Sequence, residues 1–126
     1  GVQTCALPIL TKDFAPTGDK VFGHANVGFF NNDRRMRMDF AAPVLAVQIQ
    51  FAGGTYFKEE IGRLLAFDAG GNLLVEVVSL PRGPGERETL TIVRETADIA
   101  WALAYVSEGE GSFGRFDALQ FVLTAP

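Results

Sequence analysis

The sequence predicts an all-β protein, a two-sheet antiparallel β-sandwich of about eight strands. Apolar and polar residues alternate with a period of two along several short segments, as they do in half-buried strands. Turn-forming residues separate these segments about every 8 to 12 residues. Eleven phenylalanines and fourteen glycines among 126 residues are also typical of a β-rich domain with many turns.

The length and charge of the chain limit what it can do. A domain of 126 residues buries roughly two-thirds of its unfolded surface, so one domain with a real core is expected. The net charge is −4, with acidic and basic residues interspersed, which leaves no basic face to bind the phosphates of nucleic acid. No apolar run approaches the ~20 residues of a membrane helix, so no membrane span is expected.

The first nine residues, GVQTCALPI, resemble the translation of a common sequencing-adapter oligonucleotide. We therefore expect residues 1–9 to be a non-native leader and residues 10–126 to form a single β-sandwich domain. The one cysteine, Cys5, falls within this leader. The expected domain then contains no disulfide, and its compartment cannot be read from thiols.

Residues 36–51 are the segment around which the predicted sandwich is organised. Apolar and charged residues alternate over residues 36–40, and after a break at Ala42-Pro43 a second alternating run covers residues 45–51. Two glycines, Gly53-Gly54, end this run. We expect two strands that together form one apolar sheet face, which a second layer must cover.

Further strands are expected at residues 63–69, 73–80, 89–94, 99–106 and 113–123. Ala69-Gly70-Gly71-Asn72 joins the first two of these runs and predicts a β-hairpin. Residues 97–106 contain alanines that would suit a helix. A strand is favoured because Trp101 and Tyr105 alternate with small residues, and bulky aromatic side chains suit a pleated surface.

Four segments occur in an order that resembles a known family. They are MDFAAPVLAVQIQFAGG, LLAFDAGGNLLVEV, IAWALAYV and GRFDALQFVL. The order and spacing, over residues 21–123, are similar to those of galactose-binding-like (discoidin-like) jelly-roll domains of bacterial secreted and surface proteins. The family's last motif reads hydrophobic-D-N-L-x-F, and here Ala118 stands where the family usually has asparagine.

The resemblance implies a jelly-roll sandwich located outside the cell or at its surface. It implies a non-catalytic binding module whose partner is a glycan or another cell-surface polymer. The alternative is a structural or adhesive spacer domain of a larger bacterial surface protein, without a small-molecule ligand. Likeness of fold does not choose between these functions.

Asp117 is the predicted metal-binding residue. The resemblance implies that an acidic residue in this closing strand helps to hold a structural calcium ion, a hard cation that takes 6–8 oxygen ligands. The alternative from the residues alone is that Asp117 accepts backbone N–H bonds in a neighbouring turn. Both interpretations place the carboxylate within the strand, between Phe116 and Leu119.

Tyr56 and Phe57 are the predicted ligand-binding residues. They lie in the segment TYFKEEIG, which is expected to be a loop at one end of the sheets. Flat rings stack on the C–H faces of sugars and contribute large contact area at low entropic cost. Trp101 and Tyr105 alternate on an expected strand, so packing on the sheet explains them better.

No catalytic residue is predicted. His24 is the only histidine, and no second histidine or domain cysteine exists to complete a zinc site. Candidate nucleophiles lack the flanking sequence of a catalytic elbow; these are Ser79, Ser107 and Ser112. Carboxylate pairs that could cleave glycosides by residue type alone are Glu59-Glu60, Glu86/Glu88 and Glu108/Glu110. All lie beside glycine or proline in expected loops, where solvated charge is the ordinary interpretation.

Overall fold

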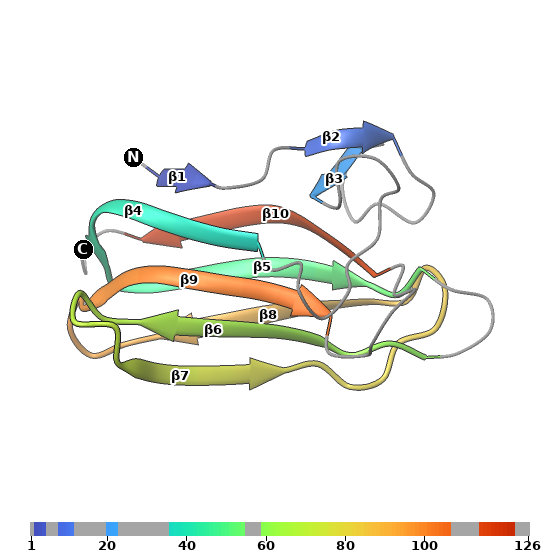
Figure 1. Cartoon of the computed structure of the whole chain (residues 1–126). Helices are drawn as coiled ribbons and strands as arrows, with labels where there is room; N and C mark the ends of the chain where they lie inside the picture. Colours follow the sequence, from blue (N-terminus) through green and yellow to red (C-terminus); the bar gives the residue numbers. More distant parts are fainter. Residues whose placement is uncertain are drawn as a thin grey trace.

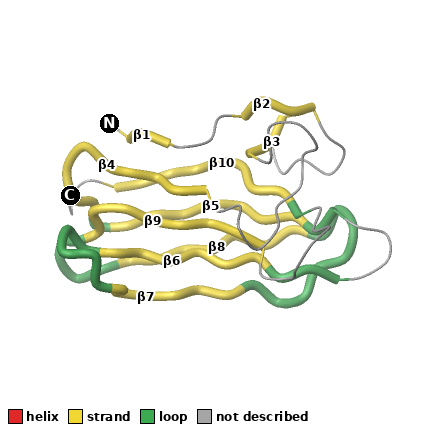
Figure 2. The backbone as a smooth tube through the Cα atoms, viewed as in Figure 1, coloured by secondary structure: helices red, strands yellow, loops and turns green. Residues whose placement is uncertain are grey.

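The computed structural model describes residues 2–4, 8–11, 20–22, 36–54, 59–106 and 114–122. In these ranges the chain forms ten β-strands and no helix (Figures 1 and 2). The strands make two five-stranded antiparallel sheets that lie one behind the other. The predicted all-β sandwich is therefore confirmed. Within the described ranges no helix is long and apolar enough to cross a membrane.

The strands of each sheet follow a definite spatial order. The first sheet has the order β1 (Val2–Thr4), β4 (Met36–Val44), β9 (Ile99–Val106), β6 (Gly62–Phe67) and β7 (Leu73–Val78). The second sheet has the order β2 (Pro8–Thr11), β3 (Lys20–Phe22), β10 (Arg115–Val122), β5 (Ala46–Ala52) and β8 (Arg87–Val93). Strand β1 and the start of β2 fall within residues 1–9, whose assignment as a non-native leader stays a prediction.

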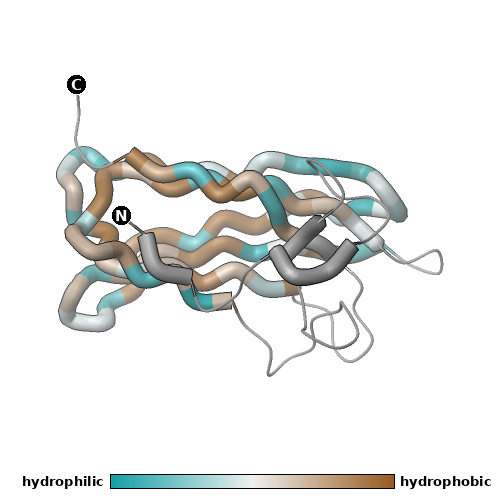
Figure 3. The backbone as a smooth tube through the Cα atoms, turned by 90° about the horizontal axis from the view of Figure 1, so that it is seen from above, coloured by the Kyte–Doolittle hydropathy of each residue, from teal (hydrophilic) through white to brown (hydrophobic). Residues whose placement is uncertain are grey.

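The core lies between the two sheets, as alternation along the strands requires. Hydrophobic and hydrophilic residues alternate along the strands when the molecule is viewed from above (Figure 3). Side chains with no exposed surface come from both layers, among them Met38, Val44, Val47, Ile49, Phe51, Leu64, Leu90, Ile99 and Phe116. Apolar residues at every second position therefore share one interior, which is what holds the sheets together.

The expectation that residues 36–51 form one apolar sheet face is wrong. Strand β4 runs through Pro43 to Val44, and after Leu45 alone the chain enters β5 in the opposite sheet. Proline is tolerated because β4 is irregular between Asp39 and Val44, where its register with β9 shifts and no ladder bond is required. The two apolar stripes therefore face each other across the core.

The predicted hairpin and the predicted strand over residues 99–106 are confirmed. Strands β6 and β7 pair antiparallel, and Gly71 in their turn has a φ of 84°, which favours glycine. The carboxylate of Asp68 accepts the backbone N–H groups of Gly70 and Asn72, each at 2.9 Å. These bonds hold the pKa of Asp68 below its ordinary value, and the bond from the Asn72 backbone contributes most.

Phe51 connects the two sheets at the end where β5 finishes. Its ring is fully buried and lies 5.2 Å from the ring of Phe116, centroid to centroid. Gly62 of β6 and Gly114 lie against this ring. A Cβ atom on Gly62 would lie 2.5 Å from Phe51 Cγ, and one on Gly114 would lie 2.7 Å from Phe51 Cε1. Only a residue without a side chain fits at either position.

We predict that Gly62→Ala destabilises the fold by about 1–3 kcal/mol, because the new methyl group must displace a buried ring. The free energy of unfolding, measured by denaturant titration, checks this. Gly70→Ala is the matched control. A Cβ there would lie 3.2 Å from Asn72 Nδ2 and 3.5 Å from Asp68 Oδ1, at the ends of two side chains rather than against a buried ring, so a change within about 0.5 kcal/mol is expected. Equal losses in both variants would contradict the packing described for Phe51.

Candidate functional site

A groove crosses the outer face of the second sheet, over β10, β5 and β8. On β5, Gln48 points outward between the buried Val47 and Ile49. The antiparallel registers place Gln120 of β10 on one side of Gln48 and Thr91 of β8 on the other. In the next row, Val122, Ala46 and Val93 lie side by side in the same way.

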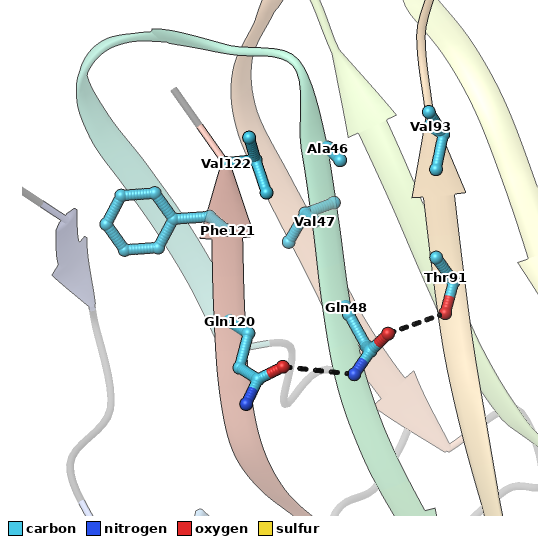
Figure 4. Close-up of a pocket in the computed structure, with 8 residues that line it drawn as sticks. All are labelled: Ala46, Val47, Gln48, Thr91, Val93, Gln120, Phe121 and Val122. Atoms are coloured by element: carbon cyan, nitrogen blue, oxygen red, sulfur yellow. Dashed lines mark hydrogen bonds between the residues drawn. The ribbon is translucent and has the colours of Figure 1, made fainter. Parts of the chain in front are cut away.

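The first row is joined by hydrogen bonds (Figure 4). Gln48 Nε2 donates to Gln120 Oε1 at 3.2 Å, and Thr91 Oγ1 donates to Gln48 Oε1 at 3.1 Å. An amide nitrogen carries two hydrogens and a hydroxyl oxygen has two lone pairs. The row therefore presents donors from the Gln120 amide at its β10 end and an acceptor from Thr91 at its β8 end.

The second row gives the groove an apolar shelf. Val93 is 68% exposed and Val122 is 46% exposed, so both present apolar surface to solvent. The groove has a volume of about 220 Å³ and is lined by Ala46, Val47, Gln48, Thr91, Val93, Gln120, Phe121 and Val122. None of these residues is ionisable. The arrangement suits an uncharged ligand that has both hydroxyl groups and C–H surface.

The turn after β8 follows Val93, the last residue of that strand in the groove lining. Arg94 and Asp98 make a two-pronged ion pair, with Nε to Oδ1 and Nη2 to Oδ2 both at 3.0 Å. The hydrogen bonds from Arg94 hold the pKa of Asp98 below its usual value, and the same contact raises the pKa of Arg94. The backbone N–H of Arg94 also donates to Leu45 O at 2.9 Å. These contacts order the turn while the two charges cancel.

Asp117, the predicted metal-binding residue, lies at a bulge of β10. The register with β5 shifts between Asp117 and Gln120, and Asp117 is only 9% exposed. Its Oδ1 accepts the backbone N–H of Ala118 at 2.7 Å, which is the local bond that the alternative interpretation expects. The described part of the chain contains no group of three His, Cys, Asp or Glu residues that could hold a metal ion. The calcium site stays a prediction.

Ala118 has a φ of 56°. Among the residues that the structure describes, no other non-glycine residue has a positive φ. The left-handed region disfavours residues with a Cβ, whereas asparagine and glycine adopt it far more readily. The family that the sequence resembles usually has asparagine at this position, and the left-handed backbone gives a physical reason for that preference. In this chain alanine adopts the same conformation at a cost.

The predicted ligand-binding residues, Tyr56 and Phe57, lie outside the described residues. So do several residues considered for catalysis, namely His24, Ser107, Glu108, Glu110 and Ser112. Trp101 packs on the outer face of the first sheet. Its ring stacks on Phe67 with centroids 3.9 Å apart and planes 6° from parallel, and the Arg37 guanidinium carbon lies 3.9 Å from the centroid. Both faces of the indole are thus covered.

Two further candidates have structural contacts. The Ser79 hydroxyl donates to Leu80 O at 2.8 Å and accepts the N–H of Gly62 at 2.9 Å. The interpretation of Glu60 as a solvated charge is wrong, because this side chain is fully buried. Its carboxylate accepts the backbone N–H groups of Gly54 at 2.9 Å and Gly114 at 3.2 Å. These donors replace water around the buried carboxylate.

Sequence reasoning missed the groove. Gln48, Thr91 and Gln120 are ordinary outward-facing residues of three strands that are distant in sequence. Alternation could have shown that Gln48 and Thr91 point outward, whereas Gln120 does so because of the bulge in β10. Only the strand order and register bring them together, and Gln48 and Gln120 are 72 residues apart.

Comparison with known proteins supports the fold. A scan against models of protein families and a search of curated proteins find no match. Among solved structures, the chain is similar to TmCBM61, a carbohydrate-binding module with a galactose-binding-like β-sandwich, in complex with β-1,4-galactotriose. The TM-score is 0.60 at 16% identity, over 98% of this chain and 88% of that chain. The similarity confirms the β-sandwich fold, and it concerns the fold alone.

We predict that Ala118→Gly and Ala118→Asn stabilise the protein, by about 0.5–1 kcal/mol for glycine, because each relieves the left-handed backbone. Denaturant unfolding of both variants measures the gain. Ala100→Gly in β9 is the control, since Ala100 lacks a positive φ and glycine there should cost about 0.5–1 kcal/mol. A loss at residue 118 as large as that at residue 100 would contradict the strain.

Proposed function

We propose that this chain is a carbohydrate-binding module that holds a neutral glycan in the groove over β10, β5 and β8. The observation that carries the proposal is the uncharged lining, in which a hydrogen-bonded row of Gln120, Gln48 and Thr91 lies beside exposed valines. Binding takes place without catalysis and outside the cell or at its surface. The use of the Ser79 hydroxyl by the backbone is consistent with a role in folding rather than as a nucleophile.

The chemistry of a sugar matches both rows of the groove. Sugar hydroxyls donate and accept hydrogen bonds, and amide and hydroxyl side chains can do both in return. The C–H surface of a pyranose ring can cover Val93 and Val122, which removes apolar area from water. The lack of any ionisable group in the lining favours neutral sugars over uronic acids, whose carboxylates would lose water without gaining a cation.

The similarity to TmCBM61 supports this choice of ligand class. That module is known in complex with β-1,4-galactotriose, and its fold matches this chain over 98% of the chain's length. A fold hosts many functions, so the likeness suggests which ligand to test first, while the groove is the reason to test it. A structural or adhesive spacer is the function that remains if no glycan binds.

We predict that β-1,4-galactan or another neutral polysaccharide binds, whereas acidic polysaccharides such as polygalacturonate do not. Gln48→Ala and Gln120→Ala should each weaken binding by about 5- to 10-fold, the effect of one or two lost hydrogen bonds. Affinity electrophoresis and titration calorimetry measure this. Thr89→Ala, on β8 but outside the lining, is the matched control and should bind as the wild type does.

The predicted aromatic pair provides a second arm of the same experiment. If Tyr56 and Phe57 stack on sugar, the double variant Tyr56→Ala/Phe57→Ala should lose binding while its melting temperature barely moves. Loss of binding in this variant together with wild-type binding by the two glutamine variants would move the site from the groove to the loop. Failure of the wild type to bind any neutral polysaccharide would favour the spacer.

We also propose that Asp117 contributes to a structural calcium site, as the resemblance implies. Its carboxylate is nearly buried within the closing strand, at the bulge beside Ala118. Calcium that binds only the folded state raises the melting temperature, so a chelator should lower it. Thermal unfolding in calcium and in chelator measures this, with Asp117→Asn expected to abolish the difference. Equal melting temperatures in both buffers would contradict a structural calcium ion.

A further inference from the structure

The groove has a hollow where its apolar row crosses β5. In the antiparallel registers, Ala46 lies between Val122 of β10 and Val93 of β8, and its side chain is a single methyl group (Figure 4). The two valines are exposed and branched, whereas Ala46 is half-buried. The short side chain therefore leaves a slot above β5, with one valine on each side.

The width of the slot over Ala46 follows from the spacing of the strands. Adjacent strands lie about 4.7–4.9 Å apart, so the backbones of Val122 and Val93 are about 9.5 Å apart. Their methyl groups narrow this gap to about 7–8 Å, which is the sum of two carbon–carbon contacts of about 3.5–4.0 Å. A sugar ring therefore fits edge-on between the valines and contacts both of them.

Hydrogen bonds beside the slot hold its two walls at this spacing. The N–H of Leu45 donates to Val122 O at 2.7 Å, and Leu45 O accepts the N–H of Arg94 at 2.9 Å. The residue before Ala46 is thus bonded to β10 on one side and to the residue after β8 on the other. Walls that are fixed before a ligand arrives need no ordering when it binds.

An edge-on ring directs its rim toward the polar row of the groove. Gln48 follows Ala46 by two residues on β5, which is about 6.8 Å along the strand. In a pyranose whose hydroxyl groups are all equatorial, these groups project from the rim, and both faces of the ring carry C–H bonds. The rim then faces the Gln48 amide, while the two faces contact Val93 and Val122.

An axial hydroxyl group does not suit this slot. In galactose the hydroxyl at C4 is axial, so one face of the ring carries an oxygen atom. Each wall of the slot is a valine side chain, which offers that oxygen no hydrogen bond. A hydroxyl that loses water without gaining a partner lowers the affinity by about tenfold.

We propose that the slot over Ala46 selects pyranoses with equatorial hydroxyl groups, as in β-1,4-glucan and β-1,4-xylan, over galactan. This inference rests on the proposed function, because it specifies the sugar that the groove holds. The groove volume of about 220 Å³ is below the roughly 300–1,000 Å³ of pockets that enclose drug-sized ligands, so the slot accommodates one ring of the chain. The similarity to TmCBM61 concerns the fold, and a fold does not determine the ligand.

Titration calorimetry with three neutral oligosaccharides of equal length tests the selection. Cellopentaose, which is β-1,4-linked glucose, and xylopentaose should each bind at least about tenfold more tightly than β-1,4-galactopentaose. Equal or tighter binding of the galactose oligosaccharide overturns the selection and leaves the proposed function in place. Failure of the wild type to bind any neutral glycan overturns the proposed function, and this inference with it.

The double variant Val93→Thr/Val122→Thr tests the role of the walls. Threonine has the shape of valine and adds a hydroxyl group that can bond an axial hydroxyl of the sugar. The preference over the galactose oligosaccharide should therefore fall by at least about threefold. Both positions are exposed, so the variant should fold. A preference equal to that of the wild type would show that the valines do not set the selection, and would overturn it.

Ala46→Val tests the position of the slot, because it fills the hollow and removes no polar group. It should weaken the binding of cellopentaose by at least about tenfold. Ala41→Val is the matched control, since Ala41 is exposed on β4 of the other sheet and should leave affinity unchanged. Valine suits a strand, so both variants should fold, which circular dichroism and thermal melting verify. Wild-type affinity in Ala46→Val would overturn the slot, and the threonine variant decides the matter if Ala46→Val does not fold.

Discussion

The packing of one aromatic ring against two glycines is the constraint on which the sandwich depends. Phe51 belongs to the second sheet, Gly62 belongs to the first, and Gly114 immediately precedes β10. Because neither glycine has a side chain, the ring enters between the layers and is fully buried. The nearby carboxylate of Glu60 accepts backbone N–H bonds from the segments after β5 and before β10. Apolar packing and buried hydrogen bonds thus hold the same end of the molecule.

This packed end positions the groove, although the groove lies on the opposite face of β5. Strand β5 lies between β10 and β8 in the second sheet, and its inward residues, including Val47 and Ile49, have no exposed surface. A strand whose inner residues are locked in a core cannot slip by one residue, because slippage would expose the whole apolar set. Gln48 is therefore held opposite Gln120 and Thr91 by neighbouring side chains that are buried in the core.

Local signals in the sequence predicted individual strands well and their arrangement poorly. Alternation identified β9 as a strand despite its alanines, and the Gly70-Gly71 pair located the β6–β7 hairpin. It could not assign strands to sheets, because an apolar stripe looks the same whichever layer it faces, and β4 and β5 were wrongly placed together. The burial of Glu60 and the hydrogen-bonded row of Gln120, Gln48 and Thr91 depend on contacts between segments that are distant in sequence. No local sequence pattern indicates such contacts.

The bulge in β10 explains why the groove has a polar row. Three steps on β10, from Asp117 to Gln120, match two steps on β5, from Gln50 to Gln48. Without the extra residue, Leu119 would stand opposite Gln48, and an apolar side chain would replace an amide on the outer face. The bulge instead turns Phe121 inward, where its ring lies 5.5 Å from that of Phe40. The left-handed backbone of Ala118 is thus the local cost of this shift, and the N–H bond to Asp117 supports it locally. The shift completes the core and places Gln120 in the polar row of the groove.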